Sequence, residues 1–133
     1  MPSGLLWAQL RTVTDIHNQK QPVRFSVRSE VVDGVLVVTA DGEIDHDVMD
    51  DFGRALLSQD APAPPRIVVD LSGVTFLDSS GINVFIAAYR RVSQAQGWLR
   101  IAGARDPMLY LMQIVGIDAL IDCHPSVGQA LKA

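Results

Sequence analysis

The sequence IVVDLSGVTFLDSSGI, residues 67–82, joins a predicted strand to a predicted helix. Its first part, up to Leu77, is apolar enough to predict a buried strand and the turn that follows it. From Ile82 to Val92 the apolar residues recur at helical spacing, which predicts a helix. The four residues between them, Asp78-Ser79-Ser80-Gly81, therefore stand at a helix N-terminus.

Two interpretations fit a serine at this position. Free backbone N–H groups and the positive end of the helix dipole tolerate a phosphate at a helix N-terminus, so Ser79 is a candidate phosphoacceptor. The structural alternative is that Asp78 or Ser79 is simply the N-cap, because Asp and Ser are preferred capping residues. Ser80 is the less favoured acceptor and is interpreted as a capping or turn hydroxyl.

The rest of the chain predicts alternating strands and helices. Asp33-Gly34 predicts a tight hairpin turn between the first two strands. Strands are expected over residues 25–31, 35–40, 66–70, 98–102 and 120–123, and helices after Asp45 to near Asp60 and over residues 82–94, 106–116 and 126–131. This order predicts an α/β fold, a mostly parallel mixed sheet with an N-terminal hairpin and flanking helices.

Side-chain roles within two of these helices follow from helical spacing. In the helix over residues 82–94, the inward stripe is expected to be Ile82, Phe85, Ile86 and Tyr89. In the helix over residues 106–116, Asp106 is expected as the N-cap and Gly116 as the end. Its core-facing residues are expected to be Met108, Leu111, Met112 and Val115, with Leu109 and Tyr110 as an exposed apolar patch.

The 133 residues are enough for one domain that buries a single core without a disulfide or a metal ion. Residues 1–22 are expected to form an extension before a single domain of residues 23–133. Leu6, Leu10 and Val13 fall at helical spacing, so a short amphipathic helix over residues 4–17 and a disordered segment are both open interpretations.

The composition excludes several classes of function. The net charge is −4 and the 11 basic residues are scattered, whereas proteins that bind a phosphate backbone concentrate them, so nucleic acid is not an expected partner. The single Cys123 rules out an internal disulfide and is expected to be reduced and buried. We find no signal-peptide pattern and no apolar stretch near the ~18 residues of a membrane span, so we expect a cytoplasmic protein without membrane association.

Five carboxylates gather between the second predicted strand and the first predicted helix. They are Glu43, Asp45, Asp47, Asp50 and Asp51, with His46 among them. Divalent cations bind carboxylate oxygens, but carboxylates also favour the first turn of a helix because of its dipole. We expect a solvated turn that Asp45 caps, with no metal or other cofactor, and His46 as a surface or partner-contact residue.

Three enzyme classes fail on specific residues. A serine hydrolase would carry Gly two residues before its nucleophile, and position 77 before Asp78-Ser79 is Leu77. A dehalogenase-type phosphotransferase that uses Asp70 as nucleophile would carry a second Asp at the position of Ser72. A receiver domain would need an acidic pair after its first strand and a Lys near its last strand, and this chain does not have these residues in place. We therefore expect that the protein is not an enzyme.

Two motifs resemble one family. Residues 68–82, around Asp78-Ser79-Ser80-Gly81, resemble the signature of STAS-domain proteins, specifically the anti-sigma factor antagonists of bacteria. Residues 40–46, ADGEIDH, look like the Gly-Glu-(Leu/Ile)-Asp turn that this family carries between its second strand and first helix. The resemblance runs from about Phe25 to Leu131. Asn83 departs from it, since many members have Gly there.

The resemblance implies a switch. In that family the unphosphorylated antagonist binds an anti-sigma factor, which releases a sigma factor, and the anti-sigma factor is a Ser kinase that phosphorylates the antagonist. Carried over, the phosphoacceptor is Ser79, and the partner-binding residues are Asp45, His46, Asp78, Ser79, Ser80, Gly81 and Asn83. A phosphatase would reset the switch. Whether the protein forms a homodimer is left undecided by the sequence. The alternative role is a STAS-domain scaffold or signalling protein in a stress-sensing complex without direct sigma-factor control.

Overall fold

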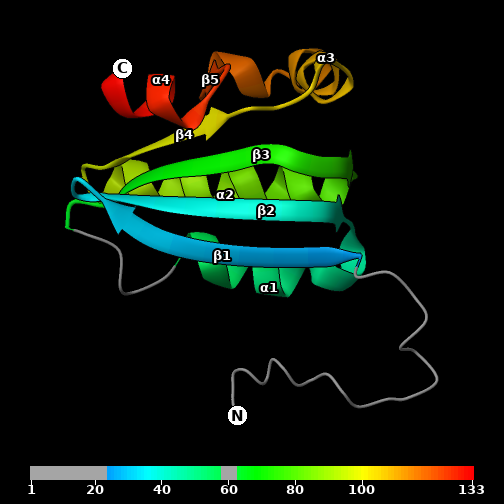
Figure 1. Cartoon of the computed structure of the whole chain (residues 1–133), viewed down its shortest axis with the longest axis horizontal. Helices are drawn as coiled ribbons and strands as arrows, with labels where there is room; N and C mark the ends of the chain where they lie inside the picture. Colours follow the sequence, from blue (N-terminus) through cyan, green and yellow to red (C-terminus); the bar gives the residue numbers. More distant parts are fainter. Residues whose placement is uncertain (1–23, 58–62) are drawn as a thin grey trace, which may run out of the picture.

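The computed structural model describes residues 24–57 and 63–133, and in this part of the chain five strands form one sheet in the order β1-β2-β3-β4-β5 (Figure 1). The strands are β1 (Phe25–Val32), β2 (Val35–Ile44), β3 (Arg66–Leu77), β4 (Trp98–Ala102) and β5 (Asp122–His124). The helices are α1 (Met49–Leu56), α2 (Ser79–Gln94), α3 (Asp106–Ile114) and α4 (Val127–Lys132), with 3-10 turns η2 (His46–Val48) and η3 (Ile117–Ala119).

The strand directions confirm the predicted α/β class. β1 and β2 pair antiparallel through the hairpin, and the other three strand pairs are parallel. Asp33 and Gly34 have φ values of 52° and 79°. A two-residue hairpin turn of type I′ requires positive φ at both residues, and this geometry matches the right-handed twist of its strands.

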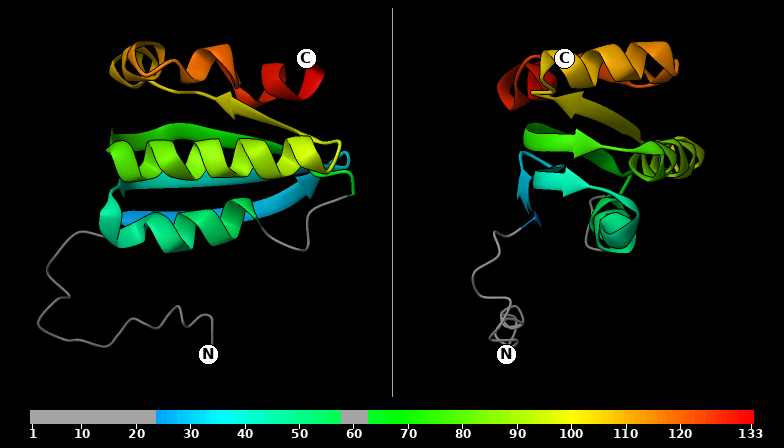
Figure 2. Two further views of the ribbon diagram at one scale, coloured as in Figure 1. Left: turned by 180° about the vertical axis from the view of Figure 1, so that it is seen from behind. Right: turned by 90° about the vertical axis from the view of Figure 1, so that its right-hand side faces the viewer.

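Helices α1 and α2 cover one face of the sheet (Figure 2), and the main core lies between them and the strands. Phe52 of α1 and Phe85 of α2 meet edge to face, with ring centroids 5.3 Å apart. Phe25 of β1 contacts Phe52 in the same way at 6.4 Å. These three rings fix α1 and α2 against the hairpin side of the sheet.

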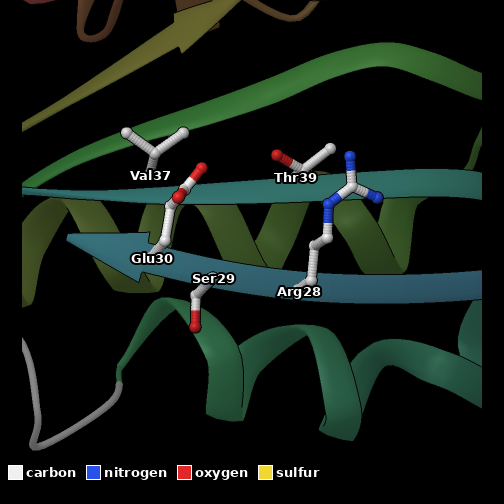
Figure 3. A pocket seen from close by; sticks show the side chains of 5 residues that line it. All are labelled: Arg28, Ser29, Glu30, Val37 and Thr39. Atoms are coloured by element: carbon white, nitrogen blue, oxygen red, sulfur yellow. The ribbon is translucent and has the colours of Figure 1, made fainter. Parts of the chain in front are cut away.

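The other face of the sheet is only partly covered. α4 packs there on β3, β4 and β5, where Ala130 joins a small apolar cluster with Val35, Val37 and Val68. Over β1 and β2 this face is polar: Arg28, Glu30 and Thr39 surround Val37 at a shallow pocket of about 220 Å³ (Figure 3). Such a solvated face is usual for an antiparallel strand pair.

The two central strands are longer than the sequence predicts. β2 continues from Ala40 to Ile44, and β3 continues past Asp70, the predicted end of this strand, to Leu77. The expected turn at Gly42-Glu43-Ile44-Asp45 is therefore the end of a strand. Register shifts between Thr39 and Asp41 and between Gly42 and Glu43 let the two strands stay paired, and Gly42 has a φ of 97°. Irregularities of this kind leave no clear period-2 pattern.

Several helix boundaries and burial predictions also need correction. α2 starts at Ser79, and its buried stripe is Ile82, Phe85, Ala88 and Val92, while Ile86 and Tyr89 are only half-buried. The N-cap position of α3 is Arg105, so Asp106 is the first helical residue. Val115 is exposed and Leu109 is half-buried. The last strand, β5, starts at Asp122. The predicted end of the α3 segment at Gly116 is confirmed, and Gly116 has a φ of 81°.

Three expectations concern residues outside those described: the helix over residues 4–17, the extension over residues 1–22, and the end of the first helix near Asp60. α1 itself is observed to end at Leu56. No helix within residues 24–57 and 63–133 has the length and apolar composition that crossing a membrane requires.

Candidate functional site

The ends of β2 and β3 bring the two sequence motifs together. Ile44 and Leu77 are register partners, and the backbone N–H of Asp78 donates to the carbonyl oxygen of Ile44 at 3.2 Å. Asp45 and Asp78, which follow these strands directly, therefore leave the same edge of the sheet. This edge is at the right of Figure 1, where α2 begins behind the strands.

Asp78 is the N-cap of α2, as one of the two sequence interpretations predicts. Its Oδ1 accepts hydrogen bonds from the backbone N–H groups of Ser80 at 2.8 Å and Gly81 at 3.3 Å. Ser79 is thus the first helical residue and not the cap, and it is exposed, whereas Ser80 is half-buried. A hydroxyl in this position is open to a second protein, while the carboxylate of Asp78 accepts from two of the free N–H groups at the helix end.

Gly81 is buried, and the structure gives it a packing role. A Cβ at this position would overlap Cδ1 of Leu77 and lie 3.0 Å from Cγ2 of Ile44. Only glycine lets the first turn of α2 lie this close to the ends of β2 and β3. Asn83, one helical turn after Ser79, is exposed on the same side of α2.

The acidic turn after β2 is built around Arg24. Nη2 of Arg24 lies 2.8 Å from Oε1 of Glu43 and 3.2 Å from Oδ2 of Asp45, and the backbone N–H of Glu43 donates to the Arg24 carbonyl at 2.6 Å. The hydrogen bond to Glu43, followed by the charges of Glu43 and Asp45, raises the pKa of Arg24. The sequence analysis missed Arg24, because Arg24 precedes β1 and is distant in the chain from Glu43 and Asp45.

Asp45 caps η2, the turn that leads into α1: its Oδ1 accepts from the backbone N–H of Asp47 at 3.0 Å. The predicted cap is therefore correct in kind, but it serves the 3-10 turn and not α1 itself. His46 and Asp47 are exposed. Among the described residues, no three His, Cys, Asp or Glu side chains are placed so that they could hold a metal ion.

A pocket of about 190 Å³ opens beside this turn, and we call it the acidic notch. It is lined by the carboxylates of Glu43, Asp45, Asp47 and Asp51, by Arg24, and by the apolar side chains of Phe25 and Val48. Arg54, outside the lining, pairs with Asp51, so four carboxylates face two guanidinium groups and the notch keeps a net negative charge. It is suited to a cationic group.

Phe76 is a second residue that sequence reasoning missed. Its side chain is 48% exposed near the end of β3, where Glu43 is its register partner on β2. Its apolar character alone predicts burial. The signal that it faces outward is its position just before Leu77, which is buried, since neighbours in a strand face opposite sides.

The comparisons with known proteins agree with this architecture. The STAS domain model matches residues 26–130, so the chain belongs to the STAS domain family. The chain is 28% identical over 102 residues to the anti-sigma F factor antagonist of Paenibacillus polymyxa, covering 74% of this chain and 85% of that protein. It is 31% identical over 61 residues to the anti-sigma-B factor antagonist of Listeria monocytogenes, covering 46% of this chain and 54% of that protein.

Solved structures give the same result. The crystal structure of an anti-sigma factor antagonist from Mycobacterium paratuberculosis is 31% identical, with a TM-score of 0.72 over 81% of this chain and 92% of that one. Bacillus SpoIIAA in its phosphorylated form is 19% identical, with a TM-score of 0.63 over 80% of this chain and 97% of that one, and shares the fold. The relatives are named for antagonism of another protein and not for a reaction, in line with a regulatory binding protein rather than an enzyme.

Proposed function

We propose that this chain is an anti-sigma factor antagonist. In its unphosphorylated form it binds an anti-sigma factor that is also a Ser kinase, and the bound anti-sigma factor releases a sigma factor. The kinase phosphorylates Ser79, which ends the binding, and a phosphatase restores the first state. The observation that carries this proposal is the exposed Ser79 at the start of α2, in a chain whose relatives bear this name.

The choice of Ser79 over Ser80 rests on accessibility. A kinase must bring the γ-phosphate of its nucleotide into line with the attacking hydroxyl, and this requires a side chain that a second protein can reach. Ser79 is exposed, whereas Ser80 is half-buried and its backbone N–H is held by Asp78. The transfer joins the Ser79 oxygen to the γ-phosphorus, releases ADP, and leaves the hydroxyl proton to a base of the kinase.

The phosphate acts on the interface and leaves the fold intact. It adds about −1.5 to −2 charges to Ser79. Because the Asp78 carboxylate already accepts from two N–H groups of α2, the phosphate does not replace the cap and projects outward. When the kinase covers Ser79, the new phosphate lies in the same contact as the remaining phosphates of the nucleotide. An unpaired dianion buried in that contact lowers the binding free energy that the two proteins gain. Dissociation of the two proteins follows.

The test is the intact mass of the protein before and after incubation with candidate anti-sigma kinases and ATP, with mapping of the modified residue. Wild type and Ser80→Ala should each gain one phosphate, and Ser79→Ala should gain none. All three proteins should have the same circular dichroism, because the changes lie outside the core. A phosphate that maps to Ser80 or to any other residue would contradict the proposal.

A further inference from the structure

Phe76 and the acidic notch both lie at the edge of the sheet that carries Ser79. Glu43 connects them, because it lines the notch and is also the register partner of Phe76. Phe76 precedes Ser79 by three residues, so their Cα atoms are at most about 11 Å apart. A typical protein interface of ~800 Å² on each partner is wide enough to cover all three features.

The two features differ in the chemistry they offer. Phe76 presents a half-exposed aromatic ring on a rigid strand, and buried aromatic anchors supply much of the energy of protein interfaces. The acidic notch has four carboxylates against two guanidinium groups, because Arg24 pairs with Glu43 and Asp45 and Arg54 pairs with Asp51, so a net negative charge remains that attracts a cation. A partner that matches both carries an apolar pocket next to a Lys or Arg side chain.

We propose that Phe76 is the anchor of the interface with the anti-sigma factor and that the acidic notch receives a basic side chain of the same partner. The inference rests on the proposed function and adds to it which residues set the affinity. Ser79 supplies the switch, Phe76 supplies affinity, and the notch supplies steering and salt dependence. The three contributions are separable because they come from different side chains with different chemistry.

Phe76→Ala tests the anchor in assays with the cognate kinase. The KM for this protein as substrate and the Kd should both rise at least about tenfold, while kcat and the modified residue stay unchanged, since binding is lost and the chemistry is not. Phe76→Leu should recover part of the affinity. Tyr110→Ala is the matched control, because Tyr110 is a more exposed aromatic residue, 66% against 48%, on α3.

Asp47→Asn with Asp51→Asn tests the notch. The association rate should fall and should depend less steeply on ionic strength than that of wild type. Asp33→Asn is the control, because Asp33 is an exposed carboxylate at the hairpin turn, the opposite end of β1 from the notch.

The outcomes separate this inference from the proposed function. A wild-type protein that no anti-sigma kinase binds would overturn both. If wild type binds and is switched at Ser79, but Phe76→Ala binds as tightly as wild type or Tyr110→Ala loses as much, only the inference is wrong. Unchanged salt dependence in the Asp47→Asn, Asp51→Asn variant would remove the notch from the interface.

Discussion

Ser79 and Ser80 carry the same hydroxyl in adjacent positions, and their surroundings give them different roles. The backbone N–H of Ser80 donates to Asp78, and its side chain is half-buried in the first turn of α2. Ser79 is the first residue of the same turn and is exposed. Two residues after Ser79, Gly81 sets how close α2 lies to the strand ends, and through this it fixes where Ser79 is presented.

Gly81→Ala should destabilise the protein. The new Cβ overlaps Leu77 and crowds Ile44, both of which are in the core, so relief requires a shift of α2 that costs about 1–3 kcal/mol. The measurement is denaturant unfolding, with Gly128→Ala as the control. At Gly128 the new Cβ would lie 3.9 Å from Oγ of Ser126, an ordinary contact, so this helical substitution should be neutral or slightly stabilising. Equal effects of the two substitutions would contradict the packing role of Gly81.

Cys123 should be a slow nucleophile in the folded protein. Cys123 is half-buried, and not buried as the sequence predicts. This partial burial, followed by the charges of Asp118 and Asp122, raises the pKa of its thiol, so the thiolate fraction at neutral pH is smaller than that of a free cysteine. Alkylation should therefore be slower in the native protein than in the unfolded one, even at pH 8. Because the native state keeps this proton longer, stability should fall as pH rises above the ordinary thiol pKa. Cys123→Ala should remove that pH dependence.

At the scale of whole elements, the hairpin, β4 and α4 follow closely from the sequence because each has a local signal. Asp33-Gly34 defines a turn, Trp98–Ala102 is predicted to the residue, and Ser126 caps α4 by accepting from the N–H of Gln129. The extensions of β2 and β3 had no such signal. Their pairing up to Ile44 and Leu77 passes two register shifts, and only tertiary contact determines whether the segment at Ser72-Gly73 turns or continues.

The candidate site divides in the same way. The motif Asp78-Ser79-Ser80-Gly81 and the cap at Asp45 can be predicted, since capping depends on residues two or three positions apart. Arg24 and Phe76 could not, because their importance depends on register across strands: Arg24 reaches Glu43 and Asp45, and Phe76 faces outward only because Leu77 faces inward.

Asp45→Ala should weaken the turn between β2 and α1. The substitution removes the cap of η2 and one carboxylate partner of Arg24, and we expect a loss of about 1 kcal/mol in the free energy of unfolding, mostly from the cap. Added Ca²⁺ or Mg²⁺ should leave the melting temperature of wild type unchanged. A rise in the melting temperature with either ion that disappears in Asp45→Ala would show that the turn is a cation site.

For the whole molecule, the parallel strands place the candidate functional residues together. The carboxyl ends of β2 and β3 and the start of α2 meet at one edge of the sheet, as is general for binding sites in parallel α/β sheets. The core behind this edge, with the packed rings of Phe25, Phe52 and Phe85, holds it rigid. We therefore expect that a charge change at Ser79 alters the surface that a partner meets while the domain keeps its structure.

The most direct test compares the affinity of the two forms of the full chain for the cognate anti-sigma kinase. Wild type that is phosphorylated on Ser79 and separated from unmodified protein should bind at least about 100-fold more weakly than unmodified wild type. This is a loss of ~2.7 kcal/mol in binding free energy, which one buried and unpaired dianion is sufficient to cause. Ser79→Ala, treated in the same way, should bind as tightly as unmodified wild type. Equal affinity of the phosphorylated and unphosphorylated forms would contradict the account.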